Sequence, residues 1–115
     1  MMDPKDLKEK CIAKLLPRCT SVDNAIEVYE DMSSGIVQAA WHLMNLSTRD
    51  EVMTTAIIQA IRDDVVKIVM QNWVDGACTH FPNNSDVAHA IGAVLLLLTN
   101  DIKVESEVYE RVDFN

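Results

Sequence analysis

Residues 85–99, SDVAHAIGAVLLLLT, decide the fold that we expect for this chain. Ser85 and Asp86 are typical helix-starting residues, and the apolar residues that follow fall on nearly every side of a helix. The thinnest face of that helix holds only Asp86, His89, Ala93 and Asn100. The sequence therefore predicts a central, almost all-apolar helix, about Ser85–Thr99, with Leu96 and Leu97 buried inside a helical bundle.

Apolar residues spaced at i, i+3, i+4 and i+7 predict further helices before this one. They cover about residues 4–16, 21–32, 36–46 and 48–76. We expect residues 33–35, Ser-Ser-Gly, to break or bend the chain between the second and third helices. The tail, 101–115, fits either a mobile end or a short helix from Glu105 to Val112. Three Gly and three Pro are few for a chain with many strand turns. We therefore expect one all-α domain, residues 1–115, a compact bundle of five to six helices.

The segment 48–76 carries two apolar stripes that point in nearly opposite directions. The first stripe comprises Met53, Ala56, Ile57, Ala60 and Ile61, and the second comprises Val65, Val66, Val69, Met70 and Trp73. We expect one continuous helix, because neither Gly nor Pro marks a break where the stripe changes side near Asp63. One small bundle does not easily cover two opposite faces. The sequence therefore predicts a homodimer whose self-association residues are Val66, Val69, Met70 and Trp73.

The charge balance disfavours whole classes of partner. The chain has a formal net charge of −8, which opposes broad contact with a phosphate backbone, so we expect no direct nucleic-acid binding. The longest apolar run, Ala90–Leu98, is about half of the roughly 20 residues that a membrane helix requires, so no membrane contact is expected.

Cysteine usage predicts a reducing compartment. Cys11, Cys19 and Cys78 are an odd number without Cys-x-x-Cys spacing. No apolar leader precedes them in the sequence given, so we expect a cytoplasmic protein.

An acidic stripe is the clearest polar feature of the sequence. Asp23, Glu27, Glu30 and Asp31 lie opposite the apolar face of the second predicted helix, and none has a Lys or Arg four residues later. One interpretation is a solvated face that the lysines of the first helix partly balance. The other is a docking surface for a partner protein with a basic surface, since unpaired carboxylates raise association rate and specificity.

The sequence contains no strong catalytic, phosphate-binding or metal motif, and we expect no cofactor and no metal site. Glu27 and Glu30 form a Glu-x-x-Glu turn, the pattern with which all-α nucleotide pyrophosphohydrolases hold magnesium. That family also requires a second Glu-x-x-Asp, whereas this chain offers only the adjacent pairs Asp50-Glu51 and Asp63-Asp64. A weaker zinc alternative combines Cys78 and His80 with His89 and either Cys19 or His42.

From these observations we expect a small acidic, non-enzymatic binding protein, such as an accessory, inhibitor or immunity-type factor. It would act by occupying the surface of a protein partner. Two alternatives stay open at this point: a carboxylate-based, metal-dependent nucleotide hydrolase, and an oligomer that sequesters a small ligand between subunits.

Overall fold

The computed structural model is all-helical in the residues that it describes, 3–77 and 80–105, with side chains described up to Thr99. Its α-helices are α1 (Pro4–Leu15), α2 (Val22–Thr48), α3 (Glu51–Val74) and α4 (Asn84–Glu105), and a short 3₁₀ turn, Leu16–Arg18, follows α1. The all-α prediction is therefore confirmed, whereas the predicted five to six helices are four in the described part of the chain. The predicted short helix Glu105–Val112 lies outside the described residues, apart from Glu105, the last residue of α4.

Each helix begins at a side chain that satisfies its free backbone amides. The carboxylate of Asp3 accepts from the Lys5 amide (3.1 Å), and the hydroxyl of Ser21 accepts from the Asn24 amide (3.0 Å). Asp50 accepts from two amides at the start of α3. At α4, Asn83 and Asp86 form a reciprocal capping box, in which each side chain accepts from the other's amide (3.1 and 2.9 Å).

Helix α2 runs unbroken through Ser33, Ser34 and Gly35, so the predicted break there is wrong. The Ser33 hydroxyl donates to the Tyr29 carbonyl (3.1 Å), a bond that an intact helix provides. Gly35 is exposed and costs a helix only about 1 kcal/mol. Because α2 buries apolar residues both before and after this point, that cost is too small to break it. This continuity removes one helix from the predicted count.

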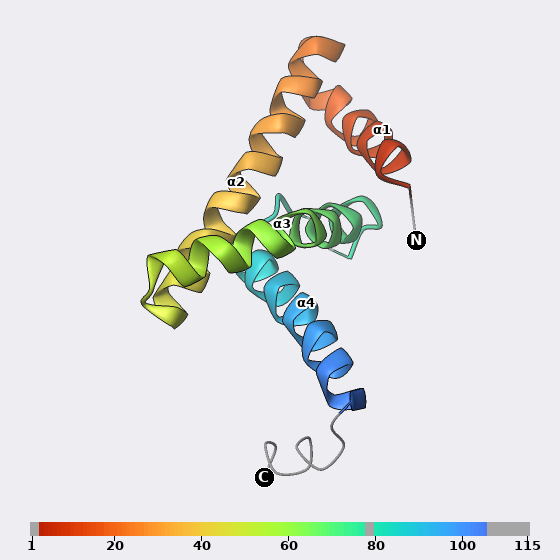
Figure 1. Cartoon of the computed structure of the whole chain (residues 1–115). Helices are drawn as coiled ribbons and strands as arrows, with labels where there is room; N and C mark the ends of the chain where they lie inside the picture. Colours follow the sequence, from red (N-terminus) through yellow and green to blue (C-terminus); the bar gives the residue numbers. More distant parts are fainter. Residues whose placement is uncertain (1–2, 78–79, 106–115) are drawn as a thin grey trace.

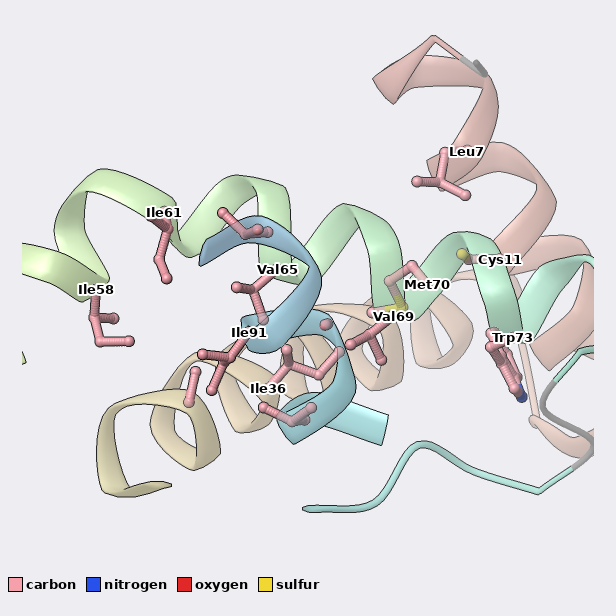
Figure 2. Close-up of a cluster of buried hydrophobic side chains, with 14 of the residues drawn as sticks. Leu7, Cys11, Ile36, Ile58, Ile61, Val65, Val69, Met70, Trp73 and Ile91 are labelled. Atoms are coloured by element: carbon pink, nitrogen blue, oxygen red, sulfur yellow. The ribbon is translucent and has the colours of Figure 1, made fainter. Parts of the chain in front are cut away.

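Helix α3 lies at the centre of the fold and packs on α1, α2 and α4 (Figure 1). It is continuous through Asp63, as the sequence predicts. The buried side chains of α3 lie on different sides of the helix at its two ends. They are Thr54, Ile58, Ile61, Val65, Val69, Met70 and Trp73. Figure 2 shows Leu7 and Cys11 of α1 beside Met70, near the C-terminal end of α3. The first predicted stripe is mostly exposed, because Met53, Ala56 and Ala60 face solvent.

A tight turn joins α2 to α3 and is fixed by polar contacts. Arg49 adopts the left-handed conformation (φ 55°) that ends α2. The buried hydroxyl of Thr54 lies 2.7 Å from that of Thr48 and donates to the Asn45 side chain (3.2 Å). Farther from the turn, the Trp41 indole donates to Thr55 (3.2 Å). These bonds hold the C-terminal end of α2 against the first turns of α3.

Helix α4 is not the central helix that the sequence predicts. It packs on α2 and α3 through one face, which consists of Val87, Ala90, Ile91 and Val94. Beyond Val94 the core ends, and Leu96, Leu97 and Leu98 are 55%, 62% and 47% exposed. Figure 1 shows this half of α4 extending away from α3. Accordingly, Leu96 and Leu97 are surface residues of the single chain, and a carboxylate placed there would not be buried.

The four helices share one apolar core, but the molecule is elongated. Its principal extents are 55 × 29 × 22 Å and its Cα radius of gyration is 16.3 Å. A compact chain of this length has a radius of gyration of about 13 Å. No helix in the described residues is long and apolar enough to span a bilayer.

Two glycines allow the helix assignments to be tested in opposite directions. A Cβ at Gly35 meets no atom within 4 Å, so Gly35→Ala should raise the free energy of unfolding by roughly 0.5–1 kcal/mol.

Gly76 follows α3 with φ +82° and closes a Schellman motif, in which the Ala77 amide donates to the Asn72 carbonyl (3.0 Å). Gly76→Ala should lower the unfolding free energy by about 1 kcal/mol. Urea denaturation measures both changes, and a destabilising Gly35→Ala would contradict an unbroken α2.

Candidate functional site

The acidic stripe lies on the solvent side of α2, opposite the residues that α2 buries. Asp23, Glu27, Glu30 and Asp31 are all exposed, which is compatible with both interpretations of the stripe. At about 100° per residue the four side chains fall within roughly 100° of arc and within about 12 Å along the axis. In the part of the chain that the structure describes, none of the four forms an ion pair within 4 Å. We refer to these four residues as the acidic face.

Two lysines of α1 lie over aromatic rings, and no described ion pair within 4 Å joins α1 to the acidic face. Lys8 Nζ is 5.8 Å from the centre of the Tyr29 ring, and Lys14 Nζ is 4.6 Å from that of Trp73. Lys14 also donates to the Trp73 backbone carbonyl. These contacts bind α1 to α2 and α3. Lys8 and Lys14 therefore contribute to packing, and in the described residues the acidic face has no ion-pair partner on α1.

Trp73 is an internal packing anchor rather than an exposed interface residue. Its ring stacks on Phe81 with centroids 5.9 Å apart, and Arg18 Cζ lies 5.5 Å from the Phe81 centroid on the neighbouring loop. With Lys14 on Trp73, this makes a chain of contacts in which two stacked rings lie between two cations, and it joins α1, the 3₁₀ turn, α3 and the loop before α4. Trp73 is buried (Figure 2).

The four predicted self-association residues therefore do not form an open surface. Val69, Met70 and Trp73 belong to the core of the single chain, and Val66 is half-buried. Leu7 and Cys11 of α1 lie beside Met70, so one chain covers the second stripe without a second copy. Asp63, near which the stripe changes side, is exposed, and its Oδ1 lies 3.5 Å from Arg62 Nε.

The structure does not assemble the carboxylate site that a nucleotide hydrolase would need. In the described residues, no group of three or more His, Cys, Asp and Glu side chains could hold a metal ion. Glu27 and Glu30 thus lack a second carboxylate pair in that part of the chain. His80 instead lies 3.3 Å from the Asp86 carboxylate and 2.9 Å from the Asn83 amide, where it supports the α4 cap.

Among the described residues, the remaining histidines and cysteines do not converge either. The His89 ring bonds to the Ser85 carbonyl (2.9 Å) within α4. His42 is exposed on α2, and Cys19 is half-buried after the 3₁₀ turn. Cys78 lies outside the described residues.

Among the hollows of the described structure, two lie where several elements of the core meet. One, about 280 Å³, lies between the middle of α2 and the loop before α4, beside Ile36, Phe81 and Asn83. The other, about 450 Å³, lies between α1, α2 and α3, where Tyr29 and Ser33 face Asp64 and Lys67. Neither combines a nucleophile with a base in hydrogen-bond contact, which is the arrangement that nucleophilic catalysis requires.

Comparison with protein-family models, with curated proteins and with solved structures finds no match for this chain. The function must therefore be argued from the surface itself. Sequence reasoning found the acidic face, but it missed the exposed leucines at the end of α4. A helix that is apolar on every side has the same pattern whether neighbours surround it or cover only one face.

Cys11 provides a test of how tightly α1 packs. Burial raises the pKa of its thiol from 9.0 to about 11, against a smaller opposing effect of Lys14. Between about pH 9 and 11 the unfolded chain therefore releases this proton while the folded chain keeps it. The thiol's contribution to stability is complete below about pH 9 and is lost as the pH rises through this window.

We expect the free energy of unfolding to fall more steeply from about pH 9 to 11 in the wild type than in Cys11→Ala. The comparison uses the slope of the unfolding free energy against pH rather than its absolute value, because Cys11→Ala also leaves a small cavity. Burial, and secondly the neighbouring Cys11, raise the pKa of Tyr29, so Cys11→Ala also lessens the Tyr29 shift and the difference between the two slopes contains both effects, which have the same sign. Denaturation midpoints measured across this range provide the slopes. Parallel slopes would mean that Cys11 is not buried as described.

Proposed function

We propose that this protein is a small acidic, non-enzymatic binding factor that occupies a basic surface of a partner protein through Asp23, Glu27, Glu30 and Asp31. The observation that carries the proposal is that all four carboxylates are exposed on one arc of α2 and lack an ion-pair partner among the described residues. An accessory, inhibitor or immunity-type role requires this kind of one-sided surface and no catalytic group.

The support beneath the acidic face is rigid, which favours binding. Helix α2 is 27 residues long, begins at the Ser21 cap and is packed along its opposite side by residues that include Ala25, Ile36, Ala40 and Met44. The carboxylates therefore keep their spacing without a partner, and little order has to be gained on binding. Lys or Arg side chains on a matching surface would speed encounter and fix orientation.

The sign of the charge selects the class of partner. A surface with four carboxylates, on a chain of net charge −8, repels phosphate groups of nucleic acids and anionic lipids alike. A basic protein surface gains from the same field, and the gain decreases as salt screens it. The partner is therefore expected to be a protein, bound without a cofactor.

The test compares two variants of equal net charge. The first removes three charges from the acidic face with Glu27→Gln, Glu30→Gln and Asp31→Asn. The control removes three exposed charges elsewhere, with Glu9→Gln, Glu51→Gln and Asp63→Asn. Both variants should unfold within about 1 kcal/mol of the wild type, because the carboxylates are exposed and the one ion pair removed, between Asp63 and Arg62, lies on the surface and contributes little.

The partner is first captured from a lysate of the source cells at low and at moderate salt. Stopped-flow association with that partner should then be roughly tenfold slower for the first variant, and less salt-dependent, with only a small change for the control. Equal association rates and equal salt dependence for wild type and both variants would show that the acidic face is only a solvated surface.

A further inference from the structure

The C-terminal half of α4 presents an apolar surface that the other helices of the described residues leave uncovered. Leu96, Leu97 and Leu98 are about half exposed or more, and they follow directly on Val94, which is buried. At about 100° per residue, Leu98 continues the buried face, Leu97 flanks it and Leu96 points to the opposite side. The three leucines therefore surround the helix end, and no single neighbouring helix of this chain could cover all of them.

A groove runs beside this surface, between α3 and α4. It has a volume of about 180 Å³, and Ile68, Val94, Leu97 and Leu98 form its apolar lining. Asp64 and Lys67 of α3 form its polar edge. The surface is thus an apolar strip with one acidic and one basic group beside it, unlike the acidic face on α2.

The exposed side of α4 has a pattern of large and small residues that can pack against the same side of a second copy. Large side chains, Leu96 and Leu97, lie one helical turn beyond the small residues Gly92 and Ala93, which are also exposed. When two such helices pair in antiparallel orientation, the large residues of each meet the small residues of the other. Small residues allow helix axes to approach closely, so leucines from both helices can be buried.

The two charged residues at the groove, Asp64 and Lys67, can also pair with those of a second copy. Asp64 and Lys67 are three residues apart on α3, so they lie on neighbouring positions of one helix face. In the described part of the chain neither forms an ion pair within 4 Å. A two-fold axis that passes between them sets Asp64 of each copy against Lys67 of the other. From Val87 to Thr99, α4 itself carries no Asp, Glu, Lys or Arg, so the net charge of −8 does not oppose contact there.

We propose that a second copy of this chain covers the end of α4, with the two α4 helices antiparallel across a two-fold axis. Leu96 and Leu97 of each copy pack on Gly92 and Ala93 of the other, and Asp64 and Lys67 pair reciprocally at the edge. A basic partner has no charge to complement on this part of α4, whereas a second copy matches it in both shape and charge. This surface is independent of the acidic face, and so is its test.

Sedimentation velocity at micromolar concentration tests the proposal with the full chain. The wild type should sediment as a dimer, at twice the chain mass of 12.9 kDa. Leu97→Glu should raise the dimer dissociation constant by roughly a hundredfold or more, because each dimer loses two leucine contacts and gains two unpaired charges. Leu97 is 62% exposed in the single chain, so this variant should keep the wild-type circular dichroism spectrum.

The control is Val22→Glu, which changes a 56% exposed residue at the start of α2, far from the end of α4 (Figure 1). It should remain dimeric. A wild-type monomer at these concentrations overturns the proposal. A dimer that Leu97→Glu leaves intact also overturns it, because association then uses a different surface.

Charge exchange tests the two-fold pairing itself. Asp64→Lys alone and Lys67→Asp alone each place like charges together across the axis, so each should weaken dimerisation relative to wild type. An equal mixture of the two variants restores opposite charges at both contacts and should form heterodimers in preference to either homodimer. A mixture that associates no better than its separate components would contradict reciprocal pairing of Asp64 and Lys67.

Discussion

The fold depends on one constraint: α3 buries different sides along its length, so its neighbours must cover it from different directions. Its buried residues run along one side from Thr54 to Val65 and then turn through Val69 and Met70 to Trp73. Apolar surface removed from water is the main favourable contribution to folding, so neither side can stay exposed. In this chain α1, α2 and α4 all pack on α3, and α1 packs near the C-terminal end of α3 (Figure 2).

Helix α1 covers that second side of α3, and two cations of the N-terminal segment take part in the contact. Lys14 lies over Trp73, and Arg18 lies over Phe81, which itself stacks on Trp73. Lys14 and Arg18 are thereby engaged in packing. Helix α1 packs on α2 and α3, and among the described residues it neither forms an ion pair with the acidic face nor covers the exposed leucines of α4.

Local features of this structure were predictable because they depend on adjacent residues. The caps at Asp3 and Ser21, the end of α3 at Gly76 and the exposure of Asp23, Glu27, Glu30 and Asp31 all follow from helix chemistry over a few positions. The continuity of α2 was not predictable in this way, because burial on both sides of Gly35 outweighs a local helix-breaking tendency. The surroundings of Leu96 and Leu97 depend on how many helices reach α4, and hydropathy along one helix does not contain that information. The same limit explains why Val69, Met70 and Trp73 suggested an interface, when α1 of the same chain covers them.

Hydrogen exchange tests the central position of α3 most directly. The measurement uses the Leu97→Glu variant at low concentration, so that association does not protect α4. The account predicts that the slowest-exchanging amides lie in α3 between Ile58 and Met70, and that amides of α4 beyond Val94 exchange much faster, because local stability follows local burial. If the slowest amides lay instead in α4 between Val94 and Thr99, α4 would be the core helix and the arrangement around α3 would be wrong.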